Sequence, residues 1–478
     1  MQAVDTAQHT SFRGFVSVVG LVILGTLVAL GVTVVGPMAV LPVFGVAFFA
    51  LVAARPEYGI ALFLSTFLMT YPAALQGGGS LTINNLLGGM FLILLSYKMY
   101  SEPDWWFLRL WEIRLLAFIF LVFYLADRFN GPDPRLLALL ADYVPRAESP
   151  RTFLTRSVFT LFFINYIRTP AHVVMIYSLG IGFMIASALS GVQSVMHGTA
   201  AAMHGYRATT TVIAAAINPN RLAMFSIFSI AGLWYVMRSL RVRALAWVVL
   251  PVIPVLCLAV FMTGSRSGLL GLGVAGAAIM LDEKFELRQL LGFALAGLLV
   301  TVLVVQLVPQ KTFERITNLP FLHSGETTVG NASVDRREYT WGVGLKMIEQ
   351  HPFIGVGGGN WELTRYLSDP THLTMAPHSS YILATVEGGL VCLLSYLALL
   401  WRTWRNFRYA EPYISAPDSP LASLRWVAKS AQVNLIVLVF VSAFADLWQL
   451  VILFWLIGLS VVLRRLVDQA ALETVGAY

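Results

Sequence analysis

The sequence predicts an all-α integral membrane protein, with about 12 to 14 transmembrane helices and one large structured periplasmic loop between two late spans. Of its 478 residues, 58% are apolar and only 12% are charged, which is far more apolar than a soluble globular protein. Apolar runs long enough to cross a bilayer recur along the chain. The only two cysteines, Cys257 and Cys392, lie inside such runs, so we expect buried thiols and no disulfide.

The sequence predicts fourteen candidate spans. They lie at 14–35, 38–54, 58–75, 83–97, 115–126, 153–167, 171–190, 221–237, 244–262, 267–281, 289–308, 378–400, 430–445 and 448–463. The window 115–126 is the weakest, and its upstream neighbour DWWFLRLWEIR either extends it or lies in the membrane interface as an aromatic, basic anchor. The first window follows a polar start containing Arg13 and lacks a clear cleavage site, which indicates a retained signal anchor.

Basic residues predict the orientation. They concentrate in three places near or after late spans: the link holding Arg238, Arg241 and Arg243, the segment 401–429, and the pair Arg464 and Arg465. The positive-inside rule therefore puts both termini in the cytoplasm and the long polar segment 309–377 outside. The stretch 127–152 carries both signs of charge and favours neither face.

The segment 309–377 is the longest polar stretch, and a loop of this length is expected to contain helices of its own. Within it, 337–350 has an amphipathic pattern, with Trp341, Leu345 and Ile348 on one helical face. Asn331 or Ser333 is a candidate cap, and Pro352 disfavours helix in the residue before it. We expect an amphipathic helix on the outer membrane surface.

Arginines near the outer ends of spans are the first candidate functional residues, because a charge at membrane depth costs free energy. Arg266 lies at a tight turn in FMTGSRSGLLGLG. It either snorkels from a helix end or, as we prefer, binds an anion beside open backbone amides. Those amides belong to the flanking residues Gly264, Ser265, Ser267 and Gly268. Arg221 follows the turn Asn218-Pro219-Asn220 and is either an interfacial helix-start residue or a ligand-binding one.

Two further arginines open the amphipathic segment. For Arg336 we favour a solvated charge balanced by Asp335 and Glu338. Arg337 shares a helical face with Trp341 and is expected to point at the membrane or a groove.

His378 opens a predicted span directly after Pro377, and Glu387 lies nine residues further along it. A lone histidine at a helix start is more often structural than catalytic. Its place at the outer rim, beneath a long structured loop, favours the catalytic interpretation here. GVGGGN at 355–360 is interpreted as a tight turn, because no strand-turn-helix unit and no GK[ST] surround it. The eight histidines form no metal-binding spacing.

Several of these segments, in this order, resemble the O-antigen ligase and polymerase superfamily of bacterial membrane glycosyltransferases. The shared motifs are N-P-N at 218–220, S-R-S-G at 265–268, R-x3-W-x6-I-x2-HPFIGVG at 337–357, and His378 followed by YI and by EGGL at 387–390. The resemblance covers about residues 205–400. In one departure, Ser379 follows the histidine where members often have Asn, which leaves the orientation of the imidazole open.

The resemblance implies an N-terminal bundle at 1–204, a catalytic region at 205–400 that includes the loop 309–377, and a C-terminal part at 401–478. It implies an enzyme of the bacterial inner membrane that acts at the periplasmic face without a cofactor or metal. The donor would be an undecaprenyl-diphosphate-linked glycan and the acceptor a glycan or lipid A-core. Expected partners are membrane lipids, a flippase and a chain-length regulator, and no nucleic acid.

Roles for individual residues also follow from the resemblance. Arg266 and Arg337 would stabilise the diphosphate leaving group, because a guanidinium can hold two phosphate oxygens at once, and direct attack would invert the anomeric centre. His378 would accept the proton of the attacking hydroxyl, with Glu387 as the fallback base. The remaining candidates for binding diphosphate or glycan are Arg221, Arg336, Asn220, Glu387 and Trp341.

Alternatives remain. Polymerase and ligase share these residues, and we favour the polymerase of a surface polysaccharide (O-antigen or exopolysaccharide) because nothing specifies a lipid A-core acceptor. A transporter or lipid-glycan flippase would show related halves and mid-helix charges, which we do not see. Another polyprenyl-dependent class places an acidic base in its first outer loop, yet the corresponding Gly36-Pro37-Met38 has no carboxylate. A scaffold without activity would leave the arginines unexplained.

Overall fold

The computed structural model describes residues 50–68, 83–101, 104–132, 135, 150–198, 207–209, 218–239, 249–283, 285, 287–317, 329–368, 376–416 and 418–476. The regular secondary structure of these residues is entirely helical, as predicted. The predicted span 14–35, most of 38–54, the turn 36–38, and Arg241 and Arg243 lie outside the described residues, as does the side chain of Arg336.

The chain forms two compact units, Met1–Gly59 and Ile60–Tyr478. In the first, Arg55 Nη1 lies 3.7 Å from Glu57 Oε1. The second contains every element described below. These elements are α5 (Ile83–Ser101), η2 (Trp106–Arg109), α6 (Trp111–Phe129), α8 (Pro150–Tyr166), α9 (Pro170–Met196), α11 (Pro219–Ser239), α13 (Val252–Met262), α14 (Arg266–Asp282), α15 (Leu287–Leu307), α16 (Gln310–Thr317), α17 (Val329–Gln350), α18 (Trp361–Ser368), α19 (Ser380–Ser415), η5 (Ala422–Leu424), α20 (Arg425–Val441) and α21 (Val451–Gly476). Another helix, α3 (Pro56–Leu68), begins in the first unit and continues into the second.

Four helical segments among the described residues are long and apolar enough to cross a membrane. They are Pro170–Met196, Pro219–Ser239, Ser380–Ser415 and Ala422–Val441. The other predicted windows from 58 onward each overlap a helix among the described residues. The protein is therefore a helical membrane protein, and the larger number of crossings stays a prediction.

Several helices extend beyond the predicted windows, among them α19 and α6. α19 continues to Ser415, because Thr403, Phe407 and Ala410 are buried at helical spacing after the apolar window ends. The anchor segment before window 115–126 divides between two elements: WFLR forms η2, and WEIR forms the first turn of α6.

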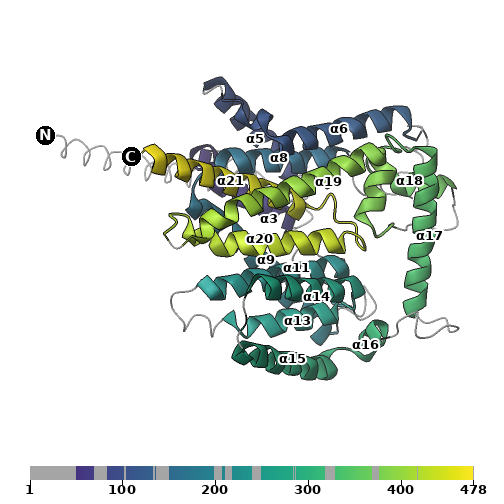
Figure 1. Cartoon of the computed structure of the whole chain (residues 1–478). Coiled ribbons are helices and arrows are strands. Elements are labelled where there is room, and N and C mark those ends of the chain that lie inside the picture. Colours follow the sequence, from purple (N-terminus) through teal and green to yellow (C-terminus); the bar gives the residue numbers. More distant parts are fainter. Residues whose placement is uncertain are drawn as a thin grey trace, which may run out of the picture. The chain divides into compact units, whose positions relative to one another are not determined.

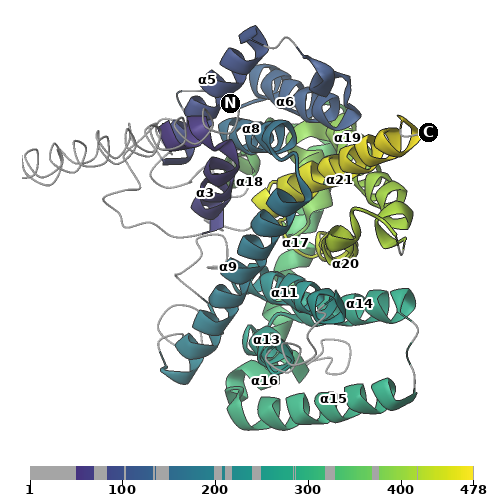
Figure 2. The same ribbon diagram turned by 90° about the vertical axis from the view of Figure 1, so that its left-hand side faces the viewer.

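α20 lies at the centre of the packing. It contacts α11 and α14 on one side and α19 and α21 on the other. α11 also packs on α9 and α13, whereas α19 also packs on α6, and α21 on α8. Figures 1 and 2 show these two groups of helices with α20 between them. Trp448, in the link from α20 to α21, is 1% exposed, and its ring lies 5.2 Å from that of Phe123.

One end of this bundle collects most of the candidate residues. α11, α14, α19 and α21 begin there, and α20 ends there. The described part of the segment 309–377 contains the helices α16, α17 and α18, which confirms that it has structure of its own. α17 packs against α19 and runs across the bundle at this end (Figure 1).

α17 ends at Gln350, as the following His351-Pro352 predicts. It begins at Val329, two residues before the first proposed cap, so the capping prediction for Asn331 and Ser333 was wrong. No proline interrupts the polar stretch 329–336, which lets the helix extend through both residues.

The glycine motifs at 355–360 and 387–390 pack against each other. Gly389 has φ 70° and ψ −176° and breaks α19. The break leaves carbonyls that accept hydrogen bonds from the turn: Val356 N donates to Val386 O and Gly357 N to Glu387 O, each at 2.9 Å. In return, Leu390 N donates to Pro352 O at 2.8 Å. GVGGGN is thus a tight turn, as predicted. Its backbone N–H groups donate hydrogen bonds to carbonyls that the break in α19 leaves without helical partners.

Candidate active site

His378 lies at the start of α19 in a strained backbone conformation. Its φ is 50°, which is uncommon for a residue other than glycine. Trp341, on α17, holds the preceding residue, because its Nε1 donates to Pro377 O at 2.8 Å. Trp341 therefore fixes the backbone that carries His378, so the structure gives it a positioning role.

Asp446, in the link between α20 and α21, faces the imidazole. His378 Nδ1 lies 3.6 Å from Asp446 Oδ2, and Ser379 N donates to Asp446 Oδ1 at 3.1 Å. Ser379 also caps α19, with its Oγ accepting from Ile382 N. The side chain of Ser379 therefore caps α19. The group beside the imidazole is the carboxylate of Asp446, which lies 68 residues further along the chain.

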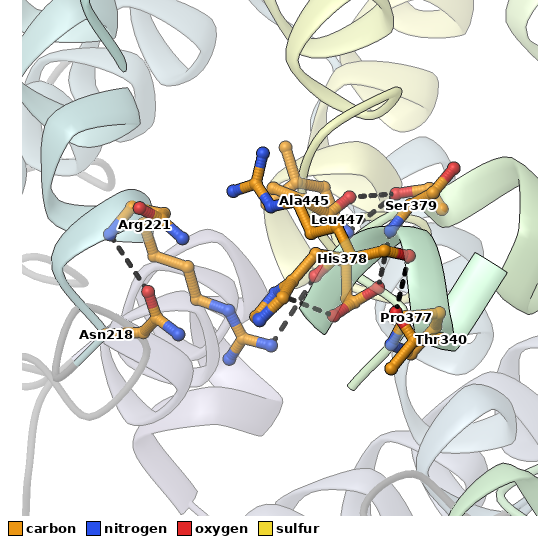
Figure 3. Close-up of polar contacts among 12 residues, drawn as sticks. Asn218, Arg221, Thr340, Pro377, His378, Ser379, Ala445 and Leu447 are labelled. Atoms are coloured by element: carbon orange, nitrogen blue, oxygen red, sulfur yellow. Dashed lines mark hydrogen bonds and ion pairs between the residues drawn. The ribbon is translucent and has the colours of Figure 1, made fainter. Parts of the chain in front are cut away.

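The two segments that carry this pair are joined by direct hydrogen bonds. Ser380 N donates to Ser442 O at 2.8 Å, and Ser380 Oγ donates to Ala445 O at 2.7 Å. Leu447 N donates back to Ser380 Oγ at 2.8 Å. Figure 3 shows these contacts around His378 and Ser379. A network of this kind holds the histidine and the carboxylate in a fixed relation.

Arg221 reaches the same link from α11. Its Nη2 donates to Asp446 O at 3.5 Å, and its backbone N donates to Asn218 O at 3.0 Å (Figure 3). The N-P-N turn is stabilised by Asn220 N, which donates to Asn218 Oδ1 at 2.9 Å. The turn thus opens α11 and directs Arg221 toward the histidine.

Arg207 is a site residue that the sequence analysis missed. Its Nε donates to Thr263 O at 2.7 Å, and its Nη2 donates to Asn220 Oδ1 at 3.2 Å. Burial, together with the charges of Arg315 and Arg337, lowers its pKa to about 9. The structure therefore places Asn220 as the residue that orients Arg207.

Arg266 begins α14 and binds the last turn of α16. Its Nε and Nη2 both donate to Arg315 O, at 3.1 and 3.0 Å. Gly264, with φ 58°, makes the tight turn before it, and a side chain there would meet Thr312 and Arg315. The guanidinium is thereby fixed beside a second arginine.

The expectation of open backbone amides around Arg266 was wrong for three of its four neighbours. Gly264 N donates to Phe261 O at 2.9 Å, Ser265 N to Thr263 Oγ1 at 3.2 Å, and Gly268 N to Ser265 Oγ at 3.0 Å. The turn satisfies its own amides because it caps α14. Any anion binding at this end therefore depends chiefly on arginine side chains.

Arg337 projects from α17, and its Nε is buried without a hydrogen-bond partner. Burial lowers its pKa, the charge of Asp446 raises it, and the charge of Arg266 lowers it. Burial lowers the pKa of His378 to about 4, and the charges of Arg337 and Arg207 contribute. The charges of Arg207 and Arg337 thus favour the neutral form of His378, and the carboxylate of Asp446 favours the charged form of Arg337.

Glu387 and Arg336 are the two remaining candidate residues. Glu387 is 2% exposed in the interior of α19, where Gln449 Nε2 donates to its Oε2 at 3.4 Å. Its backbone carbonyl accepts from the glycine turn. This supports a structural role for Glu387 at the helix break. The side chain of Arg336 lies outside the described residues, so its solvated role stays a prediction.

The sequence analysis missed Arg207, Arg315 and Asp446. Asp446 had a usable signal, since it is a single carboxylate in FADLW between the last two apolar windows. Arg207 and Arg315 lie in polar segments where an arginine is ordinary. Only their contacts with Thr263 and Arg266 join them to the site.

Comparison with known proteins adds one finding. Residues 251–397 match the family model described as O-antigen ligase. No curated protein matches the chain significantly. The matched range contains Arg266, Arg337 and His378, whereas Arg207, Arg221 and Asp446 lie outside it. The resemblance drawn from the sequence is thus confirmed for 251–397, so the chain is a helical membrane protein in which this segment is similar to the O-antigen ligase family.

Proposed function

We propose that this protein is a membrane glycosyltransferase that transfers an undecaprenyl-diphosphate-linked glycan to a sugar hydroxyl at the periplasmic face of the inner membrane. One observation carries the proposal. An imidazole, His378, lies at the end of the bundle where the charges of Arg337 and Arg207 act on it, with the carboxylate of Asp446 beside its Nδ1. A general base beside an excess of positive charge suits a reaction whose leaving group is a diphosphate.

In the proposed reaction, the acceptor hydroxyl oxygen attacks the anomeric carbon as the bond from that carbon to the diphosphate oxygen breaks. The electron pair leaves with the diphosphate, whose growing charge Arg337 and Arg266 stabilise. The hydroxyl proton passes to Nε2 of His378, since Nδ1 faces Asp446. A single displacement of this kind inverts the anomeric configuration.

The electrostatics support this direction of proton transfer. With its pKa lowered to about 4, His378 is neutral at neutral pH and has a lone pair to accept the proton. A bound diphosphate would offset the charges of Arg337 and Arg207, which raises the pKa of the imidazole toward its ordinary value. Donor binding would therefore strengthen the base that the reaction needs.

We favour polymerisation of surface-polysaccharide repeat units over ligation to lipid A-core. The two reactions use the same donor and the same base, and they differ in the acceptor. The test is to supply the purified protein, in nanodiscs, with a lipid-diphosphate glycan alone or with lipid A-core. A ladder of lengthened glycans from the donor alone supports a polymerase, whereas product that needs lipid A-core supports a ligase.

Failure of both reactions with a folded protein would contradict the proposed function. Arg405 offers a matched control, because it is an exposed arginine in the last third of α19, far along the helix from His378. Arg405→Ala should keep parental activity in either assay.

A further inference from the structure

Three exposed arginines lie on neighbouring segments at the end of the bundle where α6 begins. Arg109 ends η2, Arg114 lies in the first turn of α6, and Arg168 follows the last turn of α8. η2 packs on both α6 and α8, which keeps these segments together. Figure 1 shows α6 and α8 side by side. No step of the proposed reaction uses these arginines.

The three arginines have no acidic partner. Among the described residues, Arg109, Arg114 and Arg168 form no ion pair with a carboxylate. Arg114 Nε donates to Leu108 O at 2.8 Å and Arg168 Nε to Asn165 O at 3.2 Å, so neutral carbonyls hold both side chains. Other arginines at this end of the bundle each lie beside a carboxylate: Arg238, Arg402, Arg408 and Arg464. The charges of the first three therefore remain available to an anion from outside the described chain.

The two acidic residues of the segment 104–114 do not balance these charges. Glu112 is 1% exposed and accepts from Arg402 Nε at 3.3 Å and from Asn406 Nδ2 at 2.9 Å. Its carboxylate is thus turned into the bundle and paired there. Asp104 is exposed, and its Oδ1 accepts from Trp106 N at 3.1 Å at the start of η2. The outer surface keeps an excess of positive charge.

A fourth arginine, Arg465, binds the end of α8. Its Nη1 donates to Ile164 O at 2.5 Å, and its Nη2 donates to Ile167 O. Its guanidinium also lies 5.4 Å from the centroid of the Trp106 ring, which holds η2 at the same place. α21 begins at the His378 end, and Arg465 lies about four turns along it, so this surface is at the opposite end of the bundle.

Exposed apolar side chains lie beside the arginines. Trp105, Leu108 and Trp111 are each about half exposed. The guanidinium of Arg114 lies 5.7 Å from the centroid of the Trp111 ring. One turn further along the same face of α6, Phe118 is also exposed, as expected of a face that contacts acyl chains. The arginines thus lie where an apolar outer face ends, which is the level of the lipid headgroups in a membrane protein.

We propose that this arginine surface, formed by Arg109, Arg114 and Arg168 with Trp105 and Trp111, binds the headgroup phosphates of anionic phospholipids. Such a lipid supplies the negative charge that the arginines lack and an apolar surface for the tryptophans. A free anion or an acidic soluble protein would leave the tryptophan rings in water. A zwitterionic headgroup brings its own cation, which weakens its attraction to a positive surface. This binding is separate from the proposed glycosyl transfer and does not depend on it.

Native mass spectrometry of the purified full chain tests this. The protein is equilibrated in nanodiscs of phosphatidylglycerol and phosphatidylethanolamine in equal amounts and then released, and the ratio of the two retained lipids is measured. We expect phosphatidylglycerol to be retained in excess. Equal retention, an excess of phosphatidylethanolamine, or no retained lipid would each overturn the proposal.

Paired variants locate the lipid. Arg109→Gln combined with Arg168→Gln should lower the excess of phosphatidylglycerol by roughly fivefold for each charge removed. The matched control combines Arg238→Gln with Arg408→Gln, because it removes the same charge from two arginines at this end that already have carboxylate partners. This control should keep the parental ratio.

An equal fall in both pairs would show attraction by net charge alone and would overturn the site. If the first pair does not fold, the single variant Arg109→Gln decides, because Arg109 makes no side-chain hydrogen bond or ion pair with the described residues. A parental lipid ratio in that variant overturns the site.

Discussion

At the scale of single residues, His378 depends on three other segments for its chemistry. Trp341 holds the backbone before it, Asp446 faces Nδ1, and Arg337 and Arg207 contribute to keeping the ring neutral. The strained φ of 50° places the ring at the cost of local backbone stability. Such strain is typical of positions where geometry matters more than stability.

Replacing His378 separates the catalytic from the structural interpretation. If it is the base, His378→Ala should lower the transfer rate roughly 10²- to 10⁴-fold at equal folded concentration. Donor binding should change little, because the arginines remain. His197, an exposed histidine after α9, supplies the control His197→Ala. Near-parental turnover in His378→Ala would show a helix-start residue only.

The pH dependence should differ between the free and donor-bound enzyme. The pKa of about 4 in the free protein predicts that kcat/KM falls only as pH drops toward 4. Bound diphosphate adds negative charge, which raises the pKa, so kcat should fall at a higher pH than kcat/KM does. Steady-state rates between pH 4 and 8 measure both limbs. If kcat falls at the same pH as kcat/KM, or at a lower pH, then bound diphosphate does not raise the pKa of His378 and the proposed site is contradicted.

The arginines should require their forked geometry as well as their charge. Arg337→Ala or Arg266→Ala should each cost about 3 kcal/mol of transition-state stabilisation, or about a hundredfold in rate. Lysine at 266 should rescue poorly, because two separate N–H groups of Arg266 bind Arg315 O. Full activity of both alanine variants in the nanodisc assay would rule out the proposal that Arg266 and Arg337 stabilise the diphosphate. EDTA should have no effect.

At the scale of elements, the break in α19 connects the loop 309–377 to the bundle. The helix break at Gly389 exposes carbonyls, and the turn after α17 supplies the donors. The same pairing anchors the segment that joins α17 to α18, so it indirectly supports Arg337 and Trp341. Two motifs that look like separate glycine runs in the sequence are one structural unit.

Gly389→Ala should destabilise the protein. The backbone there has φ 70°, and an added Cβ would lie 2.1 Å from Phe353 O. A non-glycine residue in that region costs about 1–3 kcal/mol before any clash is counted. Thermal unfolding in detergent should show a lower midpoint. Gly182→Ala, on α9 with nothing within 4 Å of the added Cβ, should not lower it.

At the scale of the whole molecule, the second unit has two chemically distinct ends. One end holds His378 and the arginines around it, and the other end holds the paired charges of Arg408, Glu411 and Lys429 on α19 and α20. The distribution of basic residues predicts that the first faces the periplasm and the second the cytoplasm.

Cysteine labelling tests this orientation. Single cysteines at Glu349, on α17, and at Asp418, between α19 and α20, are both exposed positions. In a background with Cys257→Ala and Cys392→Ala, an impermeant maleimide should label position 349 in intact spheroplasts and position 418 only after lysis. If position 418 is labelled in intact spheroplasts and position 349 only after lysis, then His378 and the arginines around it face the cytoplasm.

The sequence alone determined the helical class, the positions of most apolar helices and, within 309–377, the helix that ends before His351-Pro352. It did so because apolar runs and a proline stop are local signals. It also singled out Arg221, Arg266 and His378, which lie at the ends of apolar runs, and Arg337, which shares a helical face with Trp341.

Only the tertiary structure decided which of these residues meet. Arg207 donates to Thr263 O, Asp446 accepts from Ser379 N, and Glu387 accepts from Gln449 Nε2 in the interior of α19. The reason is that each site contact joins segments far apart in the chain, whereas periodicity reports only on neighbours within a turn or two. The packing of α11, α19 and α20 brings these segments to one end of the bundle.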